Sequence, residues 1–157
     1  MQHLLFLNDR IEQKQIACYI HIPFCIKKCL YCDFYSITNL AQKNFFLSAL
    51  CKEIDNYSKL YSEKVILSSI FIGGGTPSIL PNKDIQTIFN KLKNRFVVDK
   101  DAEVTIEVNP GTALKNKLNK YFELGINRIS IGVQSFNNKD LTFLSRIHNS
   151  KQAIKTI

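Results

Sequence analysis

The sequence lacks the features that would point to a membrane-spanning or disordered protein. No apolar run is long enough to cross a membrane, and the weakly apolar opening at residues 1–6 is followed at once by charged residues, unlike a signal peptide. No low-complexity stretch or linker interrupts the 157 residues. We therefore expect a cytoplasmic protein with no membrane span.

Composition narrows the class further. Hydrophobic residues make up 45% of the chain and include 11 Phe and 6 Tyr, which is too much apolar surface for a disordered protein. The net charge of +8 raises the question of nucleic-acid binding. The lysines are scattered, however, and no basic run interleaves with aromatic residues. We expect no nucleic-acid partner.

Short apolar runs alternate with helical patterns along the chain. Strands are expected at residues 17–22, 69–72, 103–108 and 128–133. Helices are expected at 41–60, from a cap at Asn82, from a cap at Thr112 to Gly125, from Asn137 or Asn138, and at 151–157. The apolar positions expected in the third of these helices are Leu114, Leu118, Tyr121 and Phe122. Strands that alternate with helices predict an α/β fold with parallel strands joined by right-handed crossovers, either a doubly wound sheet or a barrel.

Unusual residues follow each predicted strand at its carboxyl end. A cysteine-rich loop follows the first strand, and three glycines at 73–75 follow the second. Glu107 closes the third strand, and Gln134 lies just past the fourth. The carboxyl ends of parallel strands meet at one edge, where α/β proteins place their sites. The four markers therefore predict one functional site.

The cysteine loop carries the strongest chemical signal. Cys25, Cys29 and Cys32 have the spacing C-x3-C-x2-C, which can wrap three irons of a [4Fe–4S] cluster and leave the fourth open. The amino and carboxylate groups of a methionine, as in S-adenosylmethionine (SAM), can chelate the open iron. Cys18 and Cys51 lie in a predicted strand and a predicted helix, where we expect them to pack as small hydrophobic residues.

Three other interpretations of the loop remain open at this point. A structural zinc ion would need a fourth ligand, and His21 is the nearest candidate. A disulfide with one free thiol is a second possibility, and three unliganded thiols are a third.

Five sequence blocks resemble a known family in their order along the chain. They are residues 19–34, 71–78, 103–111, 127–136 and 144–148, and they are similar to blocks of the oxygen-independent coproporphyrinogen III oxidase family of radical SAM proteins. The resemblance covers nearly the whole chain from Tyr19 onward. It implies a partial barrel of six βα units followed by a C-terminal domain, with a [4Fe–4S] cluster and SAM as cofactors.

One position separates two branches of that family. The oxidase carries a further cysteine two residues after the third ligand, where this chain has Phe34. The sequence Cys32-Asp33-Phe34 resembles instead the heme chaperone HemW branch. That resemblance implies a chaperone in heme and porphyrin metabolism that binds heme in its full-length form, passes it to acceptor proteins and takes electrons from a donor such as flavodoxin. The alternative is the oxidase itself, an enzyme that decarboxylates coproporphyrinogen III by radical chemistry.

The resemblance also assigns roles to residues, none of them catalytic. Cys25, Cys29 and Cys32 would be the cluster ligands. The cofactor contacts would be Tyr19 and Tyr31 beside the cluster, Gly74, Gly75 and Thr76 at the methionine end of SAM, Glu107 at its ribose, and Gln134 and Arg146 at a second SAM that the oxidase binds. The ordinary alternatives are packing for the tyrosines, a turn for the glycines and solvent exposure for the glutamate. His148 is expected to be solvated at a helix end.

The resemblance further implies that residues 1–157 form an incomplete radical SAM core. Only four of six βα units are present, so we expect the N-terminal four units of a truncated (β/α)6 barrel without its C-terminal strands and C-terminal domain. Such a piece leaves a sheet edge and apolar helix faces unpaired. An inactive fragment that cannot hold its cluster is therefore a third hypothesis.

Overall fold

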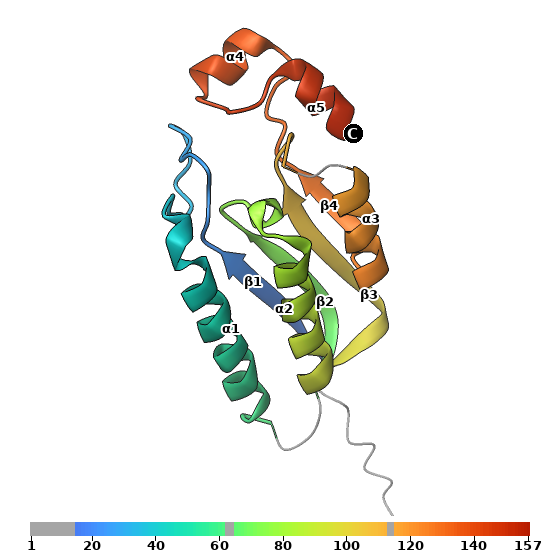
Figure 1. The fold of residues 1–157 in the computed structure, drawn as a ribbon. Coiled ribbons are helices and arrows are strands. Elements are labelled where there is room, and N and C mark those ends of the chain that lie inside the picture. Colours follow the sequence, from blue (N-terminus) through green and yellow to red (C-terminus); the bar gives the residue numbers. More distant parts are fainter. Residues whose placement is uncertain (1–14, 62–64, 113–114) are drawn as a thin grey trace, which may run out of the picture.

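The computed structural model describes residues 15–61, 65–112 and 115–157, and the predictions for residues 1–6 and for Leu114 fall outside these ranges. Four strands form one parallel sheet in the order β1-β2-β3-β4 (Figure 1). The strands are β1 (Gln15–Ile22), β2 (Ile66–Gly74), β3 (Val97–Val108) and β4 (Arg128–Ile131). The sheet confirms the α/β fold and its parallel connections.

The helices occupy two places relative to this sheet. Three of them cover one face, and two short ones lie beyond the ends of the strands toward which the arrows point (Figure 1). The covering helices are α1 (Lys43–Ser58), α2 (Asn82–Arg95) and α3 (Lys115–Leu124), and the short ones are α4 (Asn138–Phe143) and α5 (Ser150–Thr156). Two 3-10 turns, η1 (Leu40–Gln42) and η2 (Pro77–Ile79), complete the described elements. None of the helices in the described ranges is long and apolar enough to cross a membrane.

The two faces of the sheet differ because side chains alternate along each strand. The register pairs Ile20 with Ile72 and Ile72 with Ile106, and all three side chains are buried in the core. The next position along each strand has the opposite orientation, and there Phe71 pairs with Tyr19 and Thr105. The apolar face packs under the helices, whereas the other face carries polar and aromatic side chains.

Helix α2 packs on the sheet through its apolar side chains. Its apolar residues Ile85, Ile88, Phe89 and Leu92 are all buried. Burying such a side chain contributes about 1.5–3 kcal/mol, which makes this stripe a main attachment of the helix to the sheet. The predicted cap at Asn82 is wrong, because Asn82 is the first helical residue and follows an N-cap at Pro81. Its Oδ1 atom is buried and has no hydrogen-bond partner among the described residues.

Other boundaries differ from the prediction in ways that have physical reasons. Strand β3 begins at Val97 instead of residue 103 because it includes a charged stretch that breaks the apolar pattern. Strand β4 ends at Ile131, short of the expected residue 133. In α3, Tyr121 is fully buried, but Phe122 is 77% exposed and takes no part in the core. The cap at Asn137 is confirmed, since its side chain accepts a hydrogen bond from the Lys139 amide.

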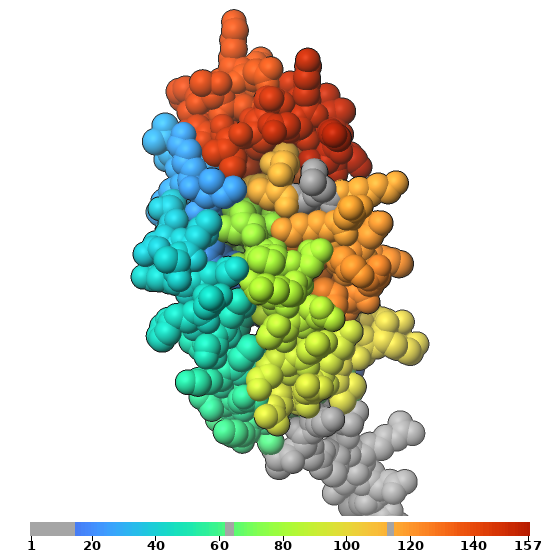
Figure 2. All heavy atoms as spheres, viewed as in Figure 1, coloured from blue at the N-terminus to red at the C-terminus, as the bar shows by residue number. Residues whose placement is uncertain are grey.

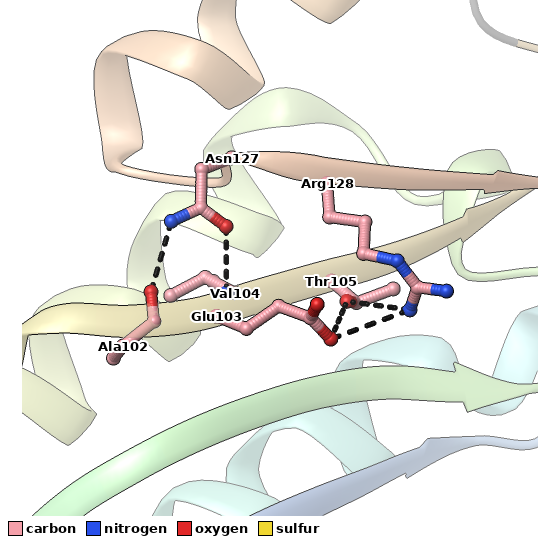
Figure 3. A network of polar contacts seen from close by, with 6 residues as sticks. All are labelled: Ala102, Glu103, Val104, Thr105, Asn127 and Arg128. Atoms are coloured by element: carbon pink, nitrogen blue, oxygen red, sulfur yellow. Dashed lines mark hydrogen bonds and ion pairs between the residues drawn. The ribbon is translucent and has the colours of Figure 1, made fainter.

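Polar contacts join the start of β4 to β3 (Figure 3). Asn127 Nδ2 donates to the Ala102 carbonyl at 2.9 Å, and the Val104 amide donates to Asn127 Oδ1 at 2.8 Å. On the polar face, Arg128 Nη1 lies 3.4 Å from Glu103 Oε1 and 3.3 Å from Thr105 Oγ1. These contacts add to the backbone pairing of the four-residue strand with β3.

Replacing Asn127 by alanine removes both side-chain hydrogen bonds to β3 and leaves the Val104 amide without its acceptor. We expect Asn127→Ala to lower the free energy of unfolding by about 1–3 kcal/mol, which urea denaturation would measure. Asn90→Ala, at an exposed position of α2, is the matched control and should change stability by less than about 0.5 kcal/mol. Equal stability of the two variants would contradict a structural role for Asn127.

Candidate functional site

A cavity of about 260 Å³ lies at the carboxyl ends of the strands, and we call it the strand-end cavity. It is lined by the cysteine loop, the end of β2, the ends of β3 and β4, and Arg146. All the residues predicted for the site except Tyr19 line it: Cys25, Cys29, Tyr31, Cys32, Gly74, Gly75, Thr76, Glu107, Gln134 and Arg146. The structure therefore brings together side chains from every strand end, although their roles stay predictions.

The three cysteines of the loop differ in exposure. Cys25 is 8% exposed, whereas Cys29 and Cys32 are half-buried, and all three are free thiols. Backbone hydrogen bonds shape the loop, from the Cys25 amide to the Ile37 carbonyl at 2.9 Å and from the Cys32 amide to the Cys29 carbonyl at 3.1 Å. The structure does not favour the disulfide alternative.

The donor set fits an iron–sulfur cluster better than a single metal ion. No group of three His, Cys, Asp or Glu side chains in the described ranges is arranged to hold one ion. A cluster makes a different demand, because each thiolate bonds a different iron and the three sulfur atoms need not converge on one point. Three thiols that line one cavity meet that demand.

The glycines are needed because the chain after β1 approaches the end of β2 closely. The Gly75 amide donates to the Ile22 carbonyl and the Thr76 amide to the Phe24 carbonyl, both at 2.8 Å. A Cβ atom at Gly75 would lie 2.7 Å from the Phe24 carbonyl oxygen and 3.0 Å from Cys25 Sγ, too close for either. Gly74 has φ +114°, which L residues with side chains rarely adopt. The main chain of Gly74–Thr76 therefore lies directly against the start of the cysteine loop, which an ordinary turn would not require.

The two glutamates of β3 differ in their position relative to the cavity. Glu107 lines the strand-end cavity, and its Oε2 atom accepts a hydrogen bond from the Gly74 amide at 3.0 Å. Glu103 lies four residues earlier on the same strand, where it contacts Arg128 on the polar face (Figure 3). Only Glu107 is placed to reach a ligand in the cavity.

Asn109 is a cavity residue that the sequence analysis missed. Its Nδ2 atom donates to Thr76 Oγ1 at 2.9 Å, and its backbone amide donates to Ser78 Oγ at 3.1 Å. The predicted third strand ends at residue 108, one residue before Asn109. Its place directly after the third strand, like that of the other markers, was the signal that could have identified it.

Tyr19 lies beside the cavity instead of in it. It is 58% exposed on the polar face of the sheet, and its hydroxyl lies 3.0 Å from His21 Nδ1. Partial burial and the charge of Glu107 raise the pKa of Tyr19. His21 Nε2 lies 2.8 Å from the Tyr35 carbonyl, so both ring nitrogens of His21 already have protein partners and a zinc ligand there is not favoured.

Tyr19 and His21 line a larger and mainly apolar groove of about 640 Å³ between β1 and α1. That groove holds none of the three loop cysteines. Its size therefore does not make it the functional site, because the chemically reactive side chains lie in the smaller cavity.

Gln134 and Arg146, which follow β4 in the sequence, also line the cavity. Gln134 has φ 66°, a left-handed conformation that is uncommon for a residue with a side chain. The Arg146 guanidinium donates to Asn109 Oδ1 and to the Gly132 carbonyl, each at 2.7 Å. Gly132 was also missed by the sequence analysis, and a Cβ atom there would lie 2.8 Å from Asn109 Oδ1.

The expectation for His148 is wrong. The residue is only 5% exposed, and its Nε2 atom lies 3.1 Å from the Val133 carbonyl. Burial and the neighbouring charge of Arg146 lower the pKa of His148. His148 therefore packs the segment after β4 against the end of that strand instead of facing solvent.

The remaining cysteines lie away from the strand-end cavity. Cys18 packs against the core from β1, and burial raises the pKa of its thiol. Cys51 is half-buried on α1. Neither lines the cavity, which fits their exclusion from the ligand set.

A parallel sheet that carries a three-cysteine loop and a glycine segment at its strand ends is the arrangement expected of radical SAM proteins. A sequence model of the radical SAM superfamily matches residues 19–157, so the chain belongs to that superfamily. The resemblance seen in the sequence is thereby confirmed at this level.

Individual relatives narrow the comparison. The heme chaperone HemW of Buchnera aphidicola (subsp. Acyrthosiphon pisum) is 42% identical over 144 residues, which cover 90% of this chain and 38% of that protein. HemW of Escherichia coli is 40% identical over 145 residues, covering 91% of this chain and 38% of the relative. The solved structure of coproporphyrinogen III oxidase (HemN) from E. coli, a radical SAM enzyme, superposes with a TM-score of 0.82 at 33% identity, covering 90% of this chain and 33% of HemN. The chain thus spans less than two fifths of the length of the relatives it matches.

Proposed function

We propose that this chain holds a [4Fe–4S] cluster on Cys25, Cys29 and Cys32 and binds SAM in the strand-end cavity, as the N-terminal part of a heme chaperone. The observation that carries the proposal is that the three thiols line the same cavity as the Gly74–Thr76 segment and Glu107. When bound, the cluster would supply an electron that can cleave the sulfonium carbon–sulfur bond of SAM.

Different residues of the chain would bind different parts of the cluster and of SAM. The thiolates would take three irons and leave one open, which gives the amino and carboxylate groups of SAM a place to bind. Gly74 and Gly75 line the cavity and carry no side chain, so a ligand can approach the main chain closely there. The Glu107 carboxylate, already fixed by the Gly74 amide, can accept hydrogen bonds from ribose hydroxyls.

The chaperone assignment rests on Phe34 and on the relatives. Phe34 is 67% exposed and lines the strand-end cavity, so a cysteine at that position would add a thiol to the site. The curated relatives with 37–43% identity include several HemW heme chaperones. Heme, heme-acceptor proteins and an electron donor such as flavodoxin are the partners that we propose for the full-length protein.

The second candidate is radical decarboxylation of coproporphyrinogen III. The observation in its favour is the superposition with HemN, an oxidase of that substrate, at a TM-score of 0.82. Phe34 argues against it.

The cluster proposal predicts which cysteines matter. After anaerobic reconstitution with iron and sulfide, we expect the unchanged chain to show [4Fe–4S] absorption, and an EPR signal after reduction that changes on addition of SAM. Replacing Cys25, Cys29 or Cys32 singly by serine should abolish the signal, because one iron loses its thiolate. Cys51→Ser is the matched control and should leave the iron content unchanged. A chain that takes up no cluster would contradict the proposal.

The SAM proposal predicts a difference between the two glutamates of β3. Glu107→Gln should weaken SAM binding to the reconstituted protein about tenfold, because charge-assisted hydrogen bonds become neutral ones. Glu103→Gln, on the same strand but outside the cavity, should change the dissociation constant by less than about twofold. Isothermal titration under anaerobic conditions measures both constants. Equal losses in the two variants would remove Glu107 from the site.

The two candidate functions differ in what the full-length protein does. We expect it to bind heme, visible as a Soret band after gel filtration, and to form no protoporphyrinogen from coproporphyrinogen III. Phe34→Cys in the same protein tests whether the missing thiol alone decides between them. Turnover of coproporphyrinogen III by the unchanged protein would favour the oxidase instead.

A further inference from the structure

The cysteine loop is held from outside by the segment that follows β4. In Figure 2 the blue surface of the loop adjoins the orange-red surface of the last part of the chain. Two neighbouring residues of that segment, Ser145 and Arg146, make direct hydrogen bonds to the loop across more than 100 residues of sequence. Nothing in the cysteine motif itself requires such contacts.

The first contact fixes the loop backbone. The Leu30 amide donates to Ser145 Oγ at 3.0 Å. Ser145 has φ 55°, in the left-handed region that residues with side chains rarely occupy. An unfavourable backbone conformation at the residue whose hydroxyl meets the loop indicates that the surrounding contacts hold it there.

The second contact reaches a sulfur atom. Arg146 Nη1 lies 3.4 Å from Cys29 Sγ and 3.2 Å from the hydroxyl of Tyr31, while Nη2 donates to Asn109 and Gly132. Both terminal nitrogens of the guanidinium are therefore used within the protein. The Nε atom is buried and has no hydrogen-bond partner among the described residues.

This geometry uses properties that belong to arginine. Its planar fork can meet two acceptors on each terminal nitrogen and keeps its charge at any physiological pH. One nitrogen faces the cysteine loop, and the other faces the ends of β3 and β4 through Asn109 and Gly132. Arg146 thereby ties the loop to the sheet that carries the rest of the cavity.

We propose that Ser145 and Arg146 form a latch that sets the position of the cysteine loop, with Arg146 as a positioning residue for Cys29. The role in cluster chemistry rests on the proposed function, whereas the hold on the loop does not. A cation that donates to a ligand sulfur stabilises the more negative, reduced cluster and raises its reduction potential. The latch therefore couples the segment after β4 both to loop order and to the potential of the cluster.

Amide hydrogen exchange in the apo chain tests the hold on the loop. Ser145→Gly suits the left-handed backbone and removes only the hydroxyl, so the Leu30 amide should exchange about fivefold faster, as expected for one lost hydrogen bond. Arg146→Gln should speed Leu30 exchange by a similar factor, because the loop loses its tie to the sheet. The Cys25 amide, which donates to Ile37, is the internal control and should change by less than about twofold. Arg95→Gln is the matched control for Arg146→Gln. It removes an arginine that pairs with Asp55 away from the cavity.

Unchanged Leu30 exchange in both folded variants would overturn the latch. If Arg146→Gln fails to fold, Ser145→Gly alone decides, since its backbone is relieved of strain. In reconstituted protein, Arg146→Gln should shift the cluster potential to a more negative value, with a smaller shift in Arg146→Lys, which keeps the charge. An unchanged potential in a loaded Arg146→Gln variant would overturn the role toward Cys29. An unchanged chain that takes up no cluster refutes the proposed function and leaves the exchange measurement valid.

Discussion

The close backbone approach at Gly75 is the constraint on which the site depends. Its amide and that of Thr76 continue the pairing of β1 with β2 past the end of β1, to the carbonyls of Ile22 and Phe24. Because Gly75 has no side chain, Cys25 can lie close to it, and both residues line the strand-end cavity. A Cβ atom at this position would meet the Phe24 carbonyl oxygen at 2.7 Å, so any larger residue requires the start of the loop to shift.

Much of this arrangement could be predicted from the sequence because it follows from local patterns. Short apolar runs identified the four strands, and parallel topology then brought the residues after each strand to one edge of the sheet. The cysteine spacing and the glycine run needed no knowledge of the rest of the chain. The family resemblance rests on the same segments, which explains why it agrees with the fold.

The parts that escaped prediction depend on contacts between distant segments. The hydrogen bond from Leu30 to Ser145 joins positions 115 residues apart, and no periodicity records such a pair. The burial of His148 likewise follows from how the segment after β4 folds back on Val133. The failed cap at Asn82 has a different cause. Pro81 takes the N-cap position, and its backbone carbonyl accepts the hydrogen bonds of the Asp84 and Ile85 amides. Local sequence rules identify candidate residues for caps and buried positions, but tertiary packing determines which of them take those roles.

The short length of β4 has a consequence for handling the chain in solution. Among the described residues this strand pairs only with β3. A strand edge that is left unpaired can recruit a second molecule through its backbone groups, and it does so more readily the longer it is. Four residues offer a template of only two pleat repeats, and the charged side chain of Arg128 lies at its start. A strand of the length of β3 at the same place would be a far stronger seed for edge-to-edge association. The short length of β4 thus makes it a weak template for edge-to-edge pairing.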